Sequence, residues 1–107
     1  MKRQPSKTAL KKIRALTKPF DTAEYLETPE DIADFLSEAF ATGDSGYITH
    51  AIGVAARAKG MSVIAEEAGV GRESLYKALD EQGNPRFATI VKVMGALGVK
   101  LEARVAS

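Results

Sequence analysis

Six residues past the middle of the chain are of types, and at a spacing, typical of a surface that contacts DNA. They are Gly71, Arg72, Glu73, Ser74, Tyr76 and Lys77. An arginine can donate two hydrogen bonds to guanine O6 and N7, and a glutamate can accept one from cytosine N4 or orient the arginine. Serine and tyrosine hydroxyls can bind phosphate oxygens, and a lysine can reach a base or a phosphate. Packing on the following loop is the alternative for Tyr76. The pattern predicts contact with the major groove of double-stranded DNA.

Two short helices are needed to position these side chains, and residues 61–79 have the pattern of a helix-turn-helix. The small and apolar residues at helix-crossing spacing are Ile64, Ala65, Ala68, Gly69, Val70, Leu75 and Ala78. Ala65 leaves room for the second helix, and Gly69 can adopt the left-handed conformation of a tight turn. The second helix would then present its first residues to the major groove. An ordinary helical hairpin with solvated charges is the alternative for this stretch.

Beyond the motif, Asn84 and Arg86 lie in a turn-rich segment, residues 80–86. Loop amides and guanidinium groups at such positions often contact the DNA backbone, although a surface ion pair is the alternative for Arg86. Asn84 and Pro85 are also expected to begin a last helix that Gly98 ends. The apolar residues expected to face the core from this helix are Phe87, Ile90, Val91, Met94 and Leu97.

Two further helices are predicted before the motif. Thr28 is a favourable N-cap and Pro29 a favourable first residue for a helix that ends near residues 42–43. Its apolar face is expected to consist of Ile32, Phe35, Leu36, Ala39 and Phe40. An alanine-rich helix over residues 47–59 follows, and Gly60 should end it. Ser62 is then expected to cap the first helix of the motif.

The last residues change their periodicity. Apolar and charged side chains alternate over residues 99–105, which predicts a short β-strand. A lone strand must pair, either with a second copy in a homodimer or with a strand of another protein; a frayed tail is the alternative. The expected organisation is a basic arm or short helix at 1–19, an all-α domain at 20–98, and a strand and tail at 99–107.

Charge is strongly segregated along the 107 residues, which suffice for about one domain. Residues 1–20 carry seven basic and no acidic side chains, and residues 21–46 carry eight acidic and no basic ones, although the net charge is only +1. Such blocks indicate more than one kind of partner surface.

No apolar run approaches the ~20 residues that span a bilayer, so a cytoplasmic protein without membrane contact is expected.

Enzyme chemistry has little support in the sequence. The chain has no cysteine and a single histidine, His50, which lies in an alanine-rich stretch without a second potential metal ligand nearby. Ser62 and Ser74 have no base spaced to activate them. Glu66 and Glu67 are adjacent, so on a helix they point about 100° apart. No catalytic residue, metal site or cofactor is predicted.

Residues 20–101 resemble a known family, the probable addiction-module antidote proteins. These are HigA-like antitoxins with a lambda-repressor-like helix-turn-helix of the Xre type. The runs that carry the resemblance are residues 20–21, 24–26, 51–53, 55–61, 72–76, 83–87 and 97–101, of which 72–76 is the most diagnostic. The family often has an acidic residue where Val54 stands.

The resemblance implies a five-helix domain and an antitoxin of a type II toxin–antitoxin module. Such a protein represses its own operon and neutralises a small basic toxin of the RelE/ParE-like (HigB) type. From charge alone, the acidic residues 21–46 would complement that toxin. The alternatives are a stand-alone Xre-type regulator of phage or chromosomal origin and a protein-interaction module with a vestigial motif. Because one module reads few base pairs, a homodimer is expected on DNA.

Overall fold

The computed structural model describes residues 25–80 and 82–106, and in this part the chain is all-helical, as predicted. Its helices are α2 (Pro29–Ala41), α3 (Ser45–Lys59), α4 (Met61–Ala68), α5 (Arg72–Ala78) and α6 (Phe87–Leu97). The basic segment 1–19, expected to be an arm or a short helix, lies outside the described residues. None of the helices in the described part combines the length and apolarity needed to cross a membrane.

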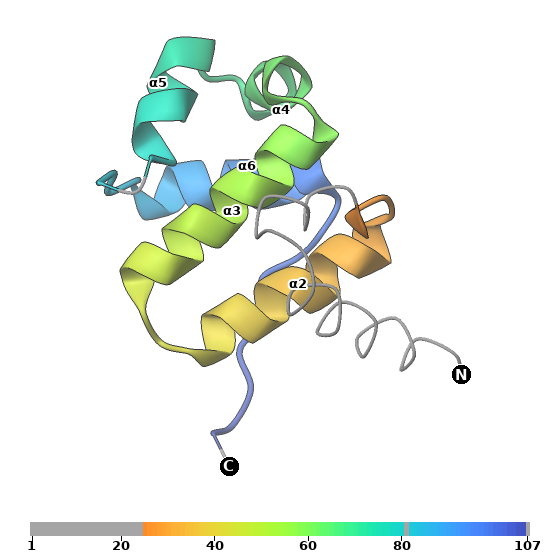
Figure 1. The fold of residues 1–107 in the computed structure, drawn as a ribbon. Helices are drawn as coiled ribbons and strands as arrows, with labels where there is room; N and C mark the ends of the chain where they lie inside the picture. The colour runs from red at the N-terminus through yellow and green to blue at the C-terminus, as the bar shows by residue number, and fades with distance from the viewer. Residues whose placement is uncertain (1–24, 81, 107) are drawn as a thin grey trace.

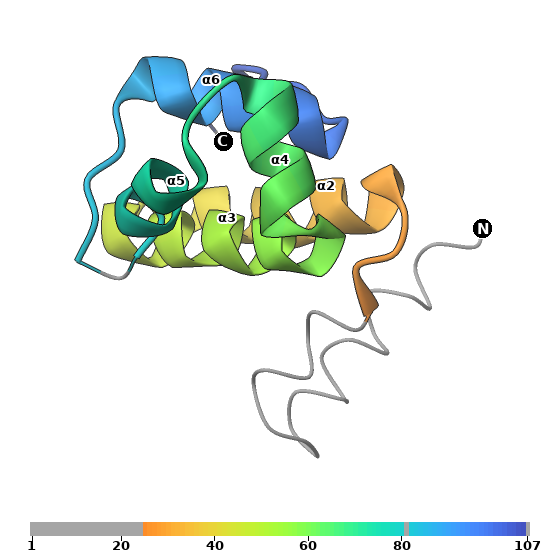
Figure 2. The same ribbon diagram turned by 90° about the horizontal axis from the view of Figure 1, so that it is seen from above.

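A single core joins these helices. Figure 1 shows α2 packed beside α3, with α4 and α5 above them and α6 behind. Figure 2, seen from above, shows α4 between α3 and α6, with which it packs. The fully buried large side chains include at least one from each of the five: Leu36, Ile52, Ile64, Leu75, Val93 and Leu97. The short helix α5 is therefore held by a core that the other four helices share.

Helix caps fix the beginnings of α2 and α3. The Thr28 hydroxyl accepts a hydrogen bond from the backbone N–H of Asp31 at 3.1 Å, and the Asp31 carboxylate accepts one from the Thr28 N–H at 3.2 Å. This reciprocal arrangement satisfies two backbone donors that have no partner within the helix. Asp44 caps α3 by accepting from the Tyr47 N–H at 3.2 Å. The predicted Thr28 cap is thus confirmed, and α3 begins two residues earlier than expected.

Two other predicted helix starts are wrong. α4 begins at Met61 rather than after Ser62, because Gly60 adopts a φ of +114° that lets a new helix start immediately after α3. α6 begins at Phe87, with Arg86 rather than Asn84 in the capping position. Residues 83–86 are not helical because they carry the chain from the end of α5 across to α6.

The far end of α6 is tied into the fold. The Lys59 ammonium group, at the end of α3, donates a hydrogen bond to the backbone oxygen of Ala96 at 3.1 Å. Carbonyl groups in the last turn of a helix have no hydrogen-bond donor within the helix. Lys59 provides a donor for the carbonyl group of Ala96. Gly98 ends the helix in the left-handed conformation, as predicted, with a φ of +83°.

The core prediction fails at the other end of α6. Phe87 is 72% exposed and Val91 is 46% exposed, although both were expected to face the core. The buried residues of this helix, Val93, Met94, Ala96 and Leu97, all lie in its second half. In the first half, Ile90 packs against the core, whereas Phe87 and Val91 lie on a side of the helix that the described part of the chain leaves uncovered. Phe40, on α2, is likewise 37% exposed.

The predicted C-terminal strand does not form in the single chain. Residues 99–106 have no regular secondary structure, and most of their side chains are exposed. A strand requires a neighbour whose backbone N–H and C=O groups it can pair with, and the described part of the chain contains no other strand. Periodicity alone therefore overstated the structure of this segment.

Candidate nucleic-acid interface

α4 and α5 are joined by the short turn that the sequence predicted. Gly69 ends α4 in the left-handed conformation, with a φ of +73°, and its N–H donates to the Glu66 oxygen at 3.2 Å. The Val70 N–H donates to the Ala65 oxygen at 3.0 Å. These two bonds satisfy two of the last four carbonyl groups of α4, and α5 begins at Arg72, three residues after Gly69.

Two leucine side chains anchor α5 to the core of the protein. Leu75 is its one buried residue, only 1% exposed, and Leu79 just beyond the helix is 3% exposed. α3 passes close to the same end: a Cβ added at Gly53 would lie 3.0 Å from the Leu79 carbonyl oxygen. The backbone at the end of α5 is therefore fixed between a leucine anchor and the surface of α3.

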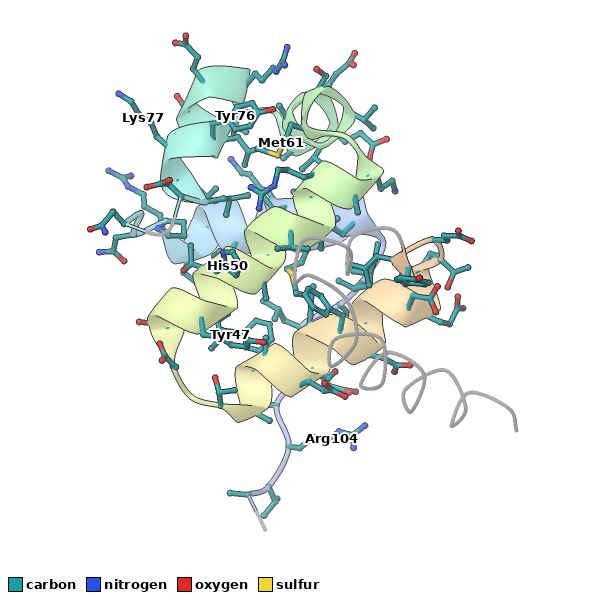
Figure 3. All side chains as sticks on the ribbon, in the orientation of Figure 1. Tyr47, His50, Met61, Tyr76, Lys77 and Arg104 are labelled. Atoms are coloured by element: carbon teal, nitrogen blue, oxygen red, sulfur yellow. The ribbon has the colours of Figure 1, made fainter. Side chains whose placement is uncertain are left out.

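The outer side of α5 carries the residues that the sequence selected. Those that the structure places on the solvent-exposed surface of α5 are Arg72, Glu73, Ser74, Tyr76 and Lys77. Figure 3 shows Tyr76 on the side of α5 that faces α4 and Lys77 on the opposite side. Gly71 precedes them at the N-cap position, where no side chain makes a capping hydrogen bond. One short helix thus brings together two cations, a carboxylate and two hydroxyl groups.

Arg72 and Tyr76 interact within this surface. The Arg72 guanidinium carbon lies 5.7 Å from the centre of the Tyr76 ring, within the range of a cation–π contact. Such a contact can orient Arg72 while guanidinium N–H donors remain available for a base edge. Sequence reasoning gave Tyr76 a phosphate-contacting role and missed this contact. The spacing of four residues on a helix was the available signal.

The loop after α5 places Asn84 and Arg86 on the surface, both exposed. An open hollow lies beside this loop and the end of α5, and it is lined by Tyr76, Lys77, Asp80, Gln82 and Gly83. Asp80 shapes the turn, because its carboxylate accepts from the Gln82 N–H at 3.1 Å. Sequence reasoning did not select Asp80 or Gln82, since a turn-forming pair carries no separate functional signal.

The other residues considered for chemistry remain apart. His50 is half-buried on α3, and Ser62 is exposed on α4. Among the described residues, no group of three or more His, Cys, Asp or Glu side chains is placed to hold a metal ion.

Comparison with known proteins places the chain in a family. Residues 16–105 match the family model described as "Probable addiction module antidote protein". An uncharacterised protein of Haemophilus influenzae (strain ATCC 51907 / DSM 11121 / KW20 / Rd) is 46% identical over 87 residues, which cover 81% of this chain and 90% of that relative. No solved structure matches the chain significantly. The chain therefore belongs to the family of addiction module antidote proteins, and this membership implies a toxin partner.

Proposed function

We propose that this antidote protein is an antitoxin that also binds operator DNA, with α4 and α5 as a lambda-repressor-like helix-turn-helix of the Xre type. In this role it represses its own operon. The observation that carries the proposal is the division of α5 into one buried anchor, Leu75, and an exposed surface with Arg72 and Lys77. A helix held in this way can enter the major groove without loss of core contacts.

Each exposed side chain of the interface has a role in this proposal. Arg72 donates to guanine O6 and N7, and Glu73 accepts from cytosine N4 or orients Arg72. Lys77 reaches a base or a phosphate from one turn further along α5. The remaining contacts are to the DNA backbone, from Ser74, Tyr76, Asn84, Arg86 and the backbone at Gly71.

The toxin partner is proposed to be a small basic protein of the RelE/ParE-like (HigB) type that binds the acidic surface of α2. The first turn of α2 carries Glu30 and Asp31, Asp34 lies one turn further, and α2 has no basic residue. Opposite charge accelerates association and favours the correct partner. Because the family implies a toxin, we favour this function over a stand-alone regulator or a module with a vestigial motif.

Operator binding is tested with DNA from upstream of the gene and a scrambled duplex of equal length. Arg72→Ala should lose about 1–3 kcal/mol of discrimination between them, or about 5- to 150-fold, because a bidentate base contact is removed. Arg104→Ala is the matched control: this arginine is 84% exposed at its side chain and lies in the C-terminal segment, away from α5. An unchanged ratio for Arg72→Ala would contradict the assignment.

Toxin binding is tested by co-expression with whatever small reading frame adjoins this gene. The neighbour should arrest growth alone, co-purify with the antidote and lose its toxicity. Glu30→Lys combined with Asp34→Lys should weaken the complex and leave operator binding intact. A complex that is unaffected by this charge reversal would place the toxin on another surface.

A further inference from the structure

The outer side of α2 is a helix face on which acidic side chains border an aromatic ring. Asp31, Asp34, Phe35 and Glu38 have the spacing i, i+3, i+4 and i+7, so they share one side of the helix. Phe35 is half-buried at the edge of the core. Figure 1 shows α2 at the edge of the described helices, where α3 is its main helical neighbour. The face therefore combines negative charge with partly exposed aromatic surface.

The first 20 residues of the same chain carry the complementary pattern. They include seven basic side chains and no acidic one. Leu10, Ile13 and Leu16 recur three residues apart, which predicts an apolar stripe on a short helix. Opposite charges attract, and an apolar stripe gains free energy by contact with aromatic surface. The chemistry of this segment thus matches both features of the α2 face.

The segment is also attached where it can reach this face. Leu26 is 5% exposed, so the chain is fixed to the core three residues before α2 begins. Residues 6–18, between Pro5 and Pro19, number thirteen, as do those of α2, and a helix of that length spans about 20 Å. Tethering raises the effective concentration of a segment near its site. Contacts too weak to hold two separate molecules can therefore hold this one.

We infer that residues 1–20 dock on the outer side of α2, with basic side chains against its acidic residues and the apolar stripe against Phe35. The family model matches from residue 16, so most of this segment lies outside the matched region. The same face is proposed above for the toxin, and a docked segment competes with a basic toxin for it. That consequence rests on the proposed function, whereas the docking itself does not.

The test is limited trypsin digestion of the full chain, with cuts within residues 1–20 followed by mass spectrometry. Trypsin cleaves after lysine and arginine, and its rate tracks the fraction of undocked segment. Asp34→Asn combined with Glu38→Gln should accelerate these cuts about two- to thirtyfold, as expected for the loss of two exposed ion pairs. The matched control is Glu66→Gln combined with Glu67→Gln, which removes two exposed charges from α4 and should change the rate less than about twofold.

A spin label locates the segment directly. The chain has no cysteine, so Thr8→Cys provides a single labelling site. With α2 otherwise unchanged, the label should broaden the NMR amide signals of α2 more than those of α5. The Asp34→Asn and Glu38→Gln substitutions should abolish that difference. The label in the unchanged α2 background remains decisive if the substituted chain melts below the wild type.

Three results would overturn the inference. They are an unchanged rate of cutting in the α2 variant, an equal acceleration by the α4 control, and a label that broadens α5 as strongly as α2. Protection from trypsin that appears only when DNA is added would assign the segment to DNA, and the inference would also fail.

The outcome is separable from the proposed function, because docking is measured without a toxin. A docked segment, together with a toxin complex that survives charge reversal on α2, supports the inference and refutes the proposed toxin surface. An undocked segment, together with a toxin complex that charge reversal weakens, gives the reverse result.

Discussion

Gly83 provides the sharpest test of how α5 is held in place. A Cβ at this position would lie 2.6 Å from the Lys77 carbonyl oxygen and 2.8 Å from the Ala78 carbonyl carbon, and closer still to the Ala78 oxygen. All three are backbone atoms at the end of α5, so no side-chain rotation can relieve the contact. Gly83→Ala must therefore displace either the loop or the last turn of α5.

The expected cost follows from this geometry. Overpacking against rigid atoms typically destabilises a fold by about 1–3 kcal/mol, and the gain from a less flexible unfolded chain offsets only about 0.4–1 kcal/mol. For a domain of this size, each kcal/mol lowers Tm by about 4–8 °C. We expect a Tm several degrees below that of the wild type, and weaker operator binding because α5 moves.

Gly95→Ala is the matched control. Gly95 is exposed within α6, and a Cβ there would meet no atom within 4 Å. Alanine in a helix is more favourable than glycine by roughly 0.5–1 kcal/mol, so this variant should melt above the wild type. Thermal denaturation followed by circular dichroism compares the two. A Gly83→Ala protein that melts at or above the wild-type Tm would refute the packing argument.

Four other predictions follow from individual residues. Thr28→Ala should lower stability by about 1 kcal/mol in urea denaturation because it removes the α2 cap, and an unchanged midpoint would contradict the cap. Leu75→Ala should cost about 2–5 kcal/mol, since this side chain is 1% exposed; a cost below 1 kcal/mol would mean that α5 is anchored elsewhere. Tyr76→Leu should lose about 0.5–1 kcal/mol of operator discrimination and Tyr76→Phe should retain it, if the ring positions Arg72; equal loss in both would implicate the hydroxyl instead. Lys77→Gln should reduce the slope of log affinity against log salt by about one, and an unchanged slope would exclude a phosphate contact.

Local chemistry made several features predictable. The Thr28 cap, the left-handed Gly69 and the left-handed Gly98 follow from side-chain and backbone preferences that act within a few residues. The same holds for the exposed positions of α5, because a buried Leu75 at helical spacing leaves its neighbours facing solvent.

Other features depended on distant parts of the chain. Phe87 and Val91 have core spacing, yet they are exposed because no other part of the described chain covers their side of α6. Residues 99–105 have strand periodicity but no strand to pair with.

The sequence by itself determined the helical class, the helix and turn pattern of residues 61–79, and the residues that α5 exposes, because these depend on short-range spacing and caps. The tertiary structure alone decided which apolar face is left uncovered and how Gly83 fits against the end of α5. Burial and close approach are properties of a side chain and its neighbours together. Periodicity shows which side of a helix is apolar, and only packing shows whether anything covers it.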